Sequence, residues 1–405
     1  MFDNSRVRED FPGTKNQVYL NAAGVSLPPR SAVEATQRIV ALLGQGPGEL
    51  GGGAYYARLW EPLVSARQEA ARLLHVTPEE IALVDDTTMG LNVALASIRF
   101  RPGDNIVLCD LEYPQVAITA EHAQRHFGAE IRVAHHRDGV VTVDDFAALI
   151  DQKTRVVLVS AVQWVNGLRL DIPAFSELAE KTGFFLIVDA IQQLGAIPLD
   201  LSRLHVDFLA AGAQKWLNAP FSVGILYASK NVWDRVEPGT AHGLFALAEP
   251  PGGWAKVLSD PDLTPFLDLP LASDARRFDV SGMPKMVGSA GLSASLAYLN
   301  HLDQEGAAEH ILALGDWLIE ELKRRGFKVW TPQAHHLRSG IVTFDPFGNG
   351  GRVHQLVQEL EKERIYLSAR YCSGAGGVRV SIHFYNNRED LEALLAVVDA
   401  ALKKM

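Results

Sequence analysis

Short apolar runs alternate with amphipathic segments between residues 60 and 227 of this chain, and this rhythm limits the fold most strongly. The runs are apolar on both faces, whereas segments such as Trp60–Leu74 and Val116–Phe127 repeat their apolar residues with helical spacing. Buried strands that alternate with helices predict an α/β fold with a mostly parallel sheet between helices. The predicted strands are Ile81–Val84, Asn105–Cys109, Ile131–Ala134, Arg155–Ser160, Phe184–Val188, Asp207–Ala210 and Gly224–Tyr227. In such a sheet a ligand lies beyond the carboxyl ends of the strands.

The rhythm changes over residues 236–285, which are rich in Pro, Gly and Asp. This composition predicts a long active-site or interface segment rather than a linker between free domains. After it, helices and strands follow one another in a mixed α+β order. We therefore predict a large domain over residues 16–285, a smaller C-terminal α+β domain over residues 286–405 and an N-terminal arm over residues 1–15.

The charge and cysteine content exclude several classes of protein. The formal net charge is −10, and no Lys/Arg-rich run offsets it, so nucleic acids and anionic membranes are not expected partners. No apolar stretch reaches the ~18 residues of a membrane span, and no secretory signal opens the chain, so we expect a cytoplasmic protein. Cys109 and Cys372 are too few for a disulfide framework and form no metal-binding motif.

Two polar residues follow neighbouring apolar runs. Asp189 ends a run that is predicted to be buried, where a carboxylate must either pair with a cation or cap the next helix. Lys215 follows the next run, among small residues. In a partly dry pocket a lysine has a lowered pKa and can form a Schiff base with an aldehyde. A buried aspartate suits the protonated ring nitrogen of pyridoxal 5′-phosphate (PLP), so the pair favours this cofactor over a surface lysine.

A phosphate group needs its own site, and Thr87 and Thr88 supply one. They follow the strand Ile81–Val84 at the predicted start of a helix, where backbone N–H groups, hydroxyls and the helix dipole bind a dianion. Thr88 could also serve as the N-cap of that helix, which is compatible with phosphate binding. The glycine-rich residues 46–54 lack GxGxxG and GK[ST], so we interpret them as a flexible border of the active site.

In this order the segments resemble the class V aminotransferase family of PLP enzymes, which includes cysteine desulfurases, kynureninase and isopenicillin N epimerase. The resemblance runs nearly end to end and implies an aspartate-aminotransferase-like fold and a homodimer with shared active sites. It rests on VYLNAAGVSLPP (18–29), DDTTMGLN (85–92), LEYPQV (111–116), SAVQWVNG (160–167), VDAIQQLG (188–195), AQKWLNAP (213–220), ARRFDVSGM (275–283) and GVRVSIHFYNN (377–387).

The resemblance implies a role for each residue that matches a motif. Lys215 holds PLP as a Schiff base and, once released, moves protons at the substrate's Cα, while Asp189 pairs with the ring nitrogen. Tyr113 stacks on the ring, and Gln192 and Gln163 hydrogen-bond its phenolic oxygen.

The remaining roles concern the phosphate and the substrate. Thr87 and Thr88 bind the phosphate, with Ser281 as a donor from the partner subunit. Arg379 binds the carboxylate of a small amino-acid-like substrate through a planar, bidentate contact, and Asn21 borders that substrate. Without the resemblance, Arg379 could equally form a salt bridge at a strand surface.

This sequence departs from the cysteine desulfurases at several positions. They have a His before the Schiff-base lysine, where this chain has Gln214, which we place with the cofactor-binding residues. Their nucleophilic cysteine lies on a long loop, whereas Cys372 lies in a short Gly-rich turn close to Arg379, and we interpret it as a spectator thiol. Gly282 and Met89 replace a Thr and an acidic residue of the family. These changes weaken a persulfide-forming mechanism but leave PLP chemistry at Cα intact.

Three hypotheses of the function follow. The first is a PLP enzyme that removes the Cα proton of a Schiff-base-bound amino acid, with transamination ahead of C–S lysis, cysteine desulfuration or epimerisation. The second is a non-catalytic PLP-binding protein, which the set of Lys215, Asp189 and Arg379 disfavours. A nicotinamide-linked dehydrogenase is excluded because no predicted strand ends in GxGxxG with an acidic residue downstream.

Overall fold

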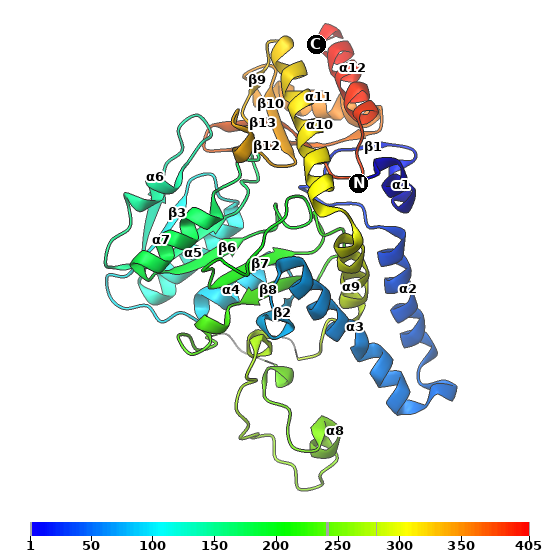
Figure 1. The fold of residues 1–405 in the computed structure, drawn as a ribbon, viewed down its shortest axis with the longest axis vertical. Helices are drawn as coiled ribbons and strands as arrows, with labels where there is room; N and C mark the ends of the chain where they lie inside the picture. The colour runs from blue at the N-terminus through cyan, green and yellow to red at the C-terminus, as the bar shows by residue number, and fades with distance from the viewer. Residues whose placement is uncertain (1, 240–242, 281, 405) are drawn as a thin grey trace.

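A seven-stranded sheet forms the centre of the molecule in the computed structural model, which describes residues 2–239, 243–280 and 282–404 (Figure 1). Along the sheet the strands are β2 (Ile81–Val84), β8 (Gly224–Ala228), β7 (Phe208–Gly212), β6 (Phe185–Asp189), β5 (Thr154–Ser160), β3 (Asn105–Cys109) and β4 (Glu130–Ala134). β8 is antiparallel to both of its neighbours, and the other pairs are parallel. The predicted α/β fold with a mostly parallel sheet is confirmed.

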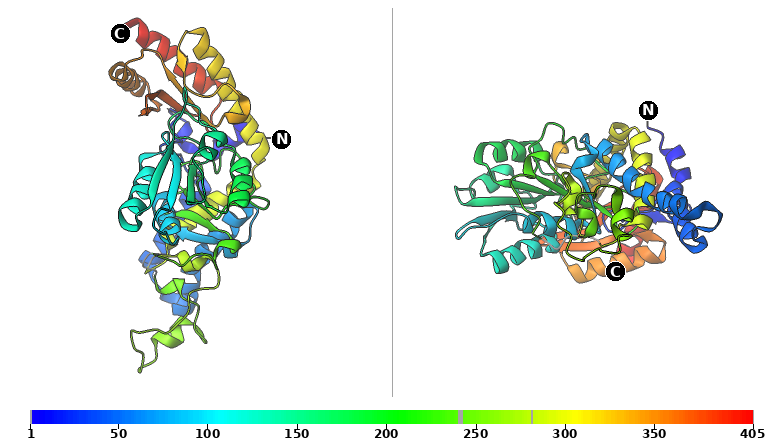
Figure 2. Two further views of the ribbon diagram at one scale, coloured as in Figure 1. Left: turned by 90° about the vertical axis from the view of Figure 1, so that its left-hand side faces the viewer. Right: turned by 90° about the horizontal axis from the view of Figure 1, so that it is seen from below.

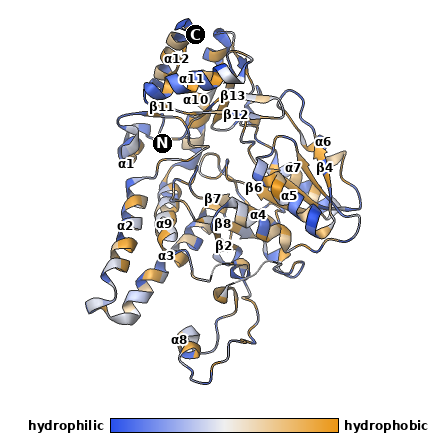
Figure 3. Ribbon diagram, turned by 180° about the vertical axis from the view of Figure 1, so that it is seen from behind, coloured by the Kyte–Doolittle hydropathy of each residue, from blue (hydrophilic) through white to orange (hydrophobic). Residues whose placement is uncertain are grey.

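Alternate residues of each central strand enter two different cores, which explains why the strands are apolar on both faces. In β3, for example, Ile106 and Leu108 belong to one core and Val107 to the other. The first core is covered by α4 (Thr87–Ala96) and α5 (Pro114–Phe127). The second is covered by α3 (Gly51–Leu74), α6 (Val143–Ala147), α7 (Ile172–Thr182) and α9 (Met286–His301). Hydrophobic residues, orange in Figure 3, gather on these strands and helices.

The C-terminal part carries a second sheet, which is antiparallel and has its own core. Its order is β12 (Ser368–Cys372), β13 (Ala375–Ser381), β10 (Ile341–Asp345) and β9 (Lys328–Val329). Packed on it are α10 (Gln304–Arg324), α11 (Gly350–Lys362) and α12 (Arg388–Lys404). The division of the chain at residue 286 stays a prediction; α9, which follows that position, buries Leu292 and Leu296 in the core of the large sheet.

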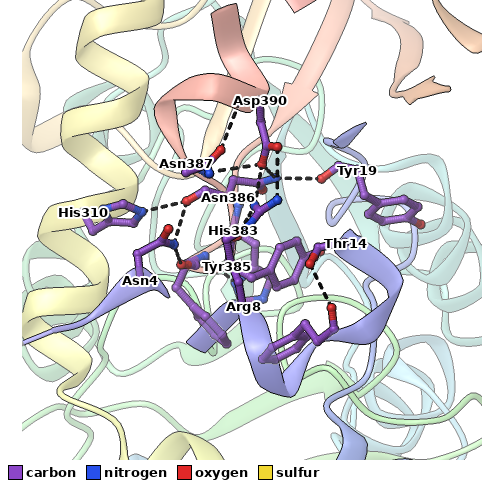
Figure 4. Close-up of polar contacts among 12 residues, drawn as sticks. Asn4, Arg8, Thr14, Tyr19, His310, His383, Tyr385, Asn386, Asn387 and Asp390 are labelled. Carbon is purple, nitrogen blue, oxygen red and sulfur yellow. Dashed lines mark hydrogen bonds and ion pairs between the residues drawn. The ribbon is translucent and has the colours of Figure 1, made fainter. Parts of the chain in front are cut away.

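The N-terminal segment joins the C-terminal part through backbone and side-chain hydrogen bonds. β1 (Val18–Tyr19) pairs with β11 (Ile365–Tyr366), and Asn21 bridges to Ser381. Figure 4 shows α1 (Asn4–Asp10) held against the turn after β13, where Asn4 donates to the carbonyl oxygen of Asn386 at 2.8 Å. Residues at opposite ends of the chain thus form one polar cluster.

Residues 236–285 contain only short helical elements within their described part, including α8 (Gly253–Leu258). Figures 1 and 2 show α8 and its flanking loops extending away from the large sheet.

Beside α3 and α9 lies α2 (Arg30–Gln45), which the sequence pattern did not predict. The predicted flexible border over residues 46–54 is partly wrong, because α3 already begins at Gly51. No helix among the described residues combines the length and apolar composition that crossing a membrane requires.

Candidate active site

Asp189 and Lys215 lie at the carboxyl edge of the large sheet, as predicted. Asp189 is the last residue of β6 and pairs in register with Ala210 of β7, while Lys215 lies in the turn after β7. The strand β7 ends in small residues, which lets the chain turn sharply at this edge of the sheet. Asp189 is buried, and its Oδ1 accepts a hydrogen bond from the backbone N–H of Ile191 at 2.9 Å. The acid therefore points past its own strand end rather than into the core.

Burial shifts the pKa values of this pair toward neutrality from opposite sides. It raises the pKa of Asp189 to about 7, against the opposing attraction of Lys215. It lowers the pKa of Lys215 to about 8, again against the opposing attraction of Asp189. Within the described chain no ion pair joins the two side chains, so they interact across a gap. Such a buried amine is reactive toward an aldehyde near neutral pH.

Tyr113 lies beside this pair. It precedes α5 as the N-cap residue, and its ring centroid is 5.5 Å from Lys215 Nζ. Trp164 meets the same ring edge-on, with centroids 5.2 Å apart. The side chain of Tyr113 is 45% exposed, so one face of the ring is available to a ligand. Stacking on PLP stays a prediction for Tyr113.

Thr87 and Thr88 begin α4, and Thr87 ties that helix to the end of β7. Its Oγ1 accepts a hydrogen bond from the backbone N–H of Gly212 at 2.8 Å. The N-cap of α4 is Asp86, whose carboxylate accepts from the N–H of Met89 at 2.8 Å, so Thr88 is not the cap. The helix N-terminus still lies at the carboxyl edge near Lys215, because Thr87 bonds to Gly212, the last residue of β7. Phosphate binding by the two threonines stays a prediction.

The three predicted glutamines, Gln192, Gln214 and Gln163, have different hydrogen-bond partners. Gln192 is buried; its Nε2 donates to the carbonyl of Ala23 at 3.1 Å and its Oε1 accepts from the indole N–H of Trp216 at 2.7 Å. Gln214, just before Lys215, accepts a hydrogen bond from the N–H of Ser26 on its backbone carbonyl. Gln163 is also buried, and its Oε1 has no partner among the described residues.

A buried glutamate beside the site was missed in the sequence. Glu112 accepts hydrogen bonds from the Nε2 of Gln163 at 3.0 Å, from the N–H of Ser160 at 3.1 Å and from the Ser160 hydroxyl. Burial raises the pKa of Glu112, although these hydrogen bonds favour its charged form. The available signal was a glutamate between Leu111 and Tyr113, three residues after the end of the buried strand β3. Glu112 orients the amide of Gln163, so that its unpaired oxygen is left for a ligand.

Arg379 lies in β13 and is 2% exposed. Its Nη1 donates to the carbonyl of Trp164 at 2.9 Å, and its Nε is buried without a partner in the described chain. Burial lowers the pKa of Arg379 to about 9, and the positive charge of Arg370 lowers it further. Sequence reasoning missed Arg370, which lies on β12 beside Arg379. The alternative of a surface salt bridge is wrong, because Arg379 is buried and no acidic side chain of the described chain pairs with it.

Three residues from the sequence analysis remain, namely Asn21, Ser281 and Cys372. Asn21 accepts a hydrogen bond on its Oδ1 from the Ser368 hydroxyl at 2.6 Å, beside Arg379 in the register of the sheet. Ser281 lies outside the described residues. Cys372 donates its thiol hydrogen to the carbonyl of Asp110 at 3.3 Å, and burial raises the pKa of the thiol. A protonated, hydrogen-bonded thiol is a poor nucleophile.

These residues fit PLP. A buried acid and a buried amine face each other without an ion pair, and an aromatic ring lies beside the amine. The Nε of Arg379 and the Oε1 of Gln163 are buried polar atoms without partners in the described chain. Buried polar atoms without partners occur elsewhere in the described chain as well. These two indicate a ligand site because Arg379 acts electrostatically on Lys215, and Glu112, which holds Gln163, acts on Asp189.

Comparisons with known proteins show the family to which the chain belongs. A family model for aminotransferase class V matches residues 18–394. Over 423 residues, the cysteine desulfurase CsdA of Escherichia coli is 26% identical, and the alignment covers 100% of this chain and 98% of CsdA. An uncharacterized aminotransferase of Bacillus subtilis, YcbU, is 26% identical over 327 residues, or 80% of each chain.

Solved structures show the fold. The crystal structure of E. coli CsdA has a TM-score of 0.85 at 24% identity and covers 100% of both chains, which shows the fold. The cystine C–S lyase C-DES, in complex with its product cysteine persulfide, has a TM-score of 0.83 at 25% identity over 96% of this chain and 99% of C-DES. A mutant of C-DES was solved with glycine covalently linked to its PLP cofactor. With most of its length matched by the family model, this chain belongs to the aminotransferase class V family of PLP-dependent enzymes.

Proposed function

We propose that the protein is a C–S lyase, which cleaves the Cβ–S bond of a cysteine-type amino acid with PLP bound to Lys215. The observation that carries this proposal is the buried pair of Asp189 and Lys215, whose pKa values of about 7 and about 8 place both near neutrality. An amine with such a pKa exchanges a proton readily at neutral pH, and this is the task at the substrate's Cα.

The residues of the site divide the work. When bound, PLP supplies an aldehyde for the amine and an electron-withdrawing ring. Lys215 moves the Cα proton, and general acid–base transfer of this kind is worth ~10²–10⁴ in rate. Asp189 would hold the ring nitrogen of the bound cofactor, and Arg379 would orient the substrate through its carboxylate. The partly exposed ring of Tyr113 would cover one face of the bound cofactor.

C–S cleavage is favoured over transamination by the relatives that are named as cysteine desulfurases and by the structure of a cystine C–S lyase. A persulfide on this chain's own cysteine is disfavoured, because the thiol of Cys372 is held by a backbone carbonyl and has a raised pKa. Transamination is our second candidate, on the ground that YcbU is named an aminotransferase.

The test is to supply PLP and cystine to the purified protein and to measure pyruvate and the form of the cofactor. C–S lysis is expected to release cysteine persulfide, pyruvate and ammonia from cystine and to leave the Lys215–PLP absorbance band intact. Transamination would instead convert the cofactor to pyridoxamine 5′-phosphate. Lys215→Ala is expected to abolish the band and the turnover, and a turnover that survives this change would falsify the assignment of Lys215.

Two further parts of the proposal concern the assembly and its location. We propose a homodimer, in which Ser281 of the partner subunit would complete the phosphate site. Analytical ultracentrifugation of the PLP-loaded protein tests this, and a monomer at assay concentration would contradict it. Location in the cytoplasm stays a prediction of the sequence.

A further inference from the structure

Two arginines lie on one face of the small sheet, and that face is turned toward the large sheet. Along β12 and β13 the residues Ala369, Val378 and Val380 enter the core of the small sheet, so their neighbours Arg370 and Arg379 lie on the other face. In the register of the two strands, Arg379 lies opposite Ser368 and Arg370 opposite Gly377. The two arginines are therefore a diagonal cross-strand pair, and such neighbours lie about 7–8 Å apart in an ordinary sheet, with their Cβ atoms somewhat closer.

Neither arginine is neutralised by an acidic side chain of the described chain. The Nη1 of Arg379 donates to the carbonyl of Trp164, and the Nη1 of Arg370 donates to the carbonyl of Ala369 at 2.8 Å. Both partners are uncharged backbone oxygens. In a chain with a formal net charge of −10, two guanidinium groups side by side without an acidic partner are a local exception. Like charges at this spacing repel, so the arrangement costs stability unless anions bind to it.

Both positive charges act on the candidate active site. Arg379 and Arg370 each lower the pKa of Lys215, after the larger effect of burial. Arg379 also interacts with Tyr113, whose ring lies over Lys215. The two arginines thus border the same space as the reactive amine.

Their exposure differs. Arg379 is buried, and its unpaired Nε leaves one edge of its guanidinium for a single carboxylate. Arg370 is exposed to solvent, and its cross-strand neighbour is Gly377. One carboxylate bound at the inner arginine would leave the outer arginine unpaired.

We propose that the substrate carries a second anionic group at the far end of its side chain, which Arg370 binds while Arg379 binds the α-carboxylate. This inference rests on the proposed C–S lyase function and narrows its substrate class. The class is a thioether or disulfide amino acid with a carboxylate beyond the sulfur atom. Arg370 is a specificity-determining residue in this account, because it discriminates between acidic and neutral side chains.

The test uses two ligands of the same shape and different charge, S-carboxymethyl-L-cysteine and its amide, S-carbamoylmethyl-L-cysteine. Each is titrated into the PLP-loaded protein, and the dissociation constant is read from the change in the Lys215–PLP absorbance band, independently of turnover. The acid is expected to bind about 10-fold more tightly than the amide, the size of one charge-assisted hydrogen bond. Added salt is expected to reduce this ratio.

Two variants test which arginine causes the preference for the acid over the amide. Arg370→Gln is expected to bring the acid-to-amide ratio to about 1 by weakening the acid alone, while the protein still forms the Lys215–PLP band. Arg379→Gln is expected to weaken both ligands equally. Equal binding of acid and amide by the unaltered protein would overturn the inference. An Arg370→Gln variant that weakens both ligands alike would also overturn it, since both arginines would then hold one carboxylate. Absence of the Lys215–PLP band from the unaltered protein would instead overturn the proposed function, and the inference with it.

Discussion

Asp189 and Lys215 each favour the charged form of the other, although burial opposes the charge on both. They follow neighbouring strands, β6 and β7, and share the carboxyl edge of the large sheet. A buried acid and amine that both titrate near neutral pH are costly in a fold and useful in catalysis. Because no ion pair joins the two side chains, the pKa of Lys215 and the pKa of Asp189 can each be tested by a separate measurement.

The rate of PLP capture by the apo protein is expected to depend on the pKa of Lys215. Only the neutral amine attacks the aldehyde, so the rate should rise with pH, with a midpoint near 8 rather than near the usual value of about 10.4. Asp189→Asn removes a charge that raises the pKa of Lys215, so its midpoint should move to lower pH. The rate of growth of the absorbance band measures this, and Asp200→Asn is the control at an exposed position. An upward shift in Asp189→Asn would contradict the coupling.

The stability of the apo protein should fall as pH rises through the pKa of Asp189. The folded state keeps the proton up to about pH 7, whereas the unfolded carboxyl loses it near 3.9. The folded state therefore binds more protons between pH 4 and 7, and in this window its stability falls with rising pH. Asp189→Asn is expected to be more stable than the unaltered protein by roughly 1–3 kcal/mol at pH 8. Thermal unfolding at pH 4 and pH 8 tests this, because the difference should disappear at pH 4.

Asn386 is expected to hold the N-terminal segment to the small sheet (Figure 4). It is buried, its Nδ2 donates to the Tyr19 carbonyl at 3.0 Å and to Asp390 at 2.9 Å, and its Oδ1 accepts from the N–H of His383 at 2.9 Å. Asn386→Ala leaves these groups unpaired and should cost about 2–4 kcal/mol of unfolding free energy. Asn387→Ala is the matched control, since its Oδ1 accepts one hydrogen bond, from the N–H of Asp390. Equal losses in urea unfolding would count against a special role for Asn386.

The strands of the large sheet could be predicted because burial on both faces leaves a local apolar pattern in the sequence. The reversed direction of β8 was not predicted, yet it has a simple cause. The residues between β7 and β8 are too few for the helical crossover that a parallel connection needs. α2 was missed because it buries little more than Ala35 and Ile39 against its neighbours. α1 was missed because its partners, such as Asn386, lie at the other end of the chain.

Site residues could be predicted where they belong to a sequence motif. They could not be predicted where their role depends on contacts with residues distant in the sequence. Asp189 and Lys215 follow strand ends, a position visible in the sequence. Glu112 was missed because its importance depends on Ser160 and Gln163, which only the packing of β3 against β5 brings near. Arg370 was missed because only the register of β12 and β13 places it beside Arg379. The predicted bond of Gln192 to the cofactor ring stays a prediction.

Cys372 is expected to be dispensable for C–S cleavage. Its thiol donates to the carbonyl of Asp110, and burial raises its pKa, so little thiolate forms at neutral pH. Cys372→Ser keeps a donor at this position and should release pyruvate from cystine at a rate within about twofold of the unaltered protein. The double variant Cys109→Ser/Cys372→Ser removes both cysteines of the chain and extends the test. A desulfurase that forms a persulfide on Cys372 would instead lose nearly all sulfur release with the single change, while its Lys215–PLP band stayed intact. That combination of results would show that the protein is a desulfurase rather than a lyase, because the thiol of Cys372 would then accept the sulfur atom.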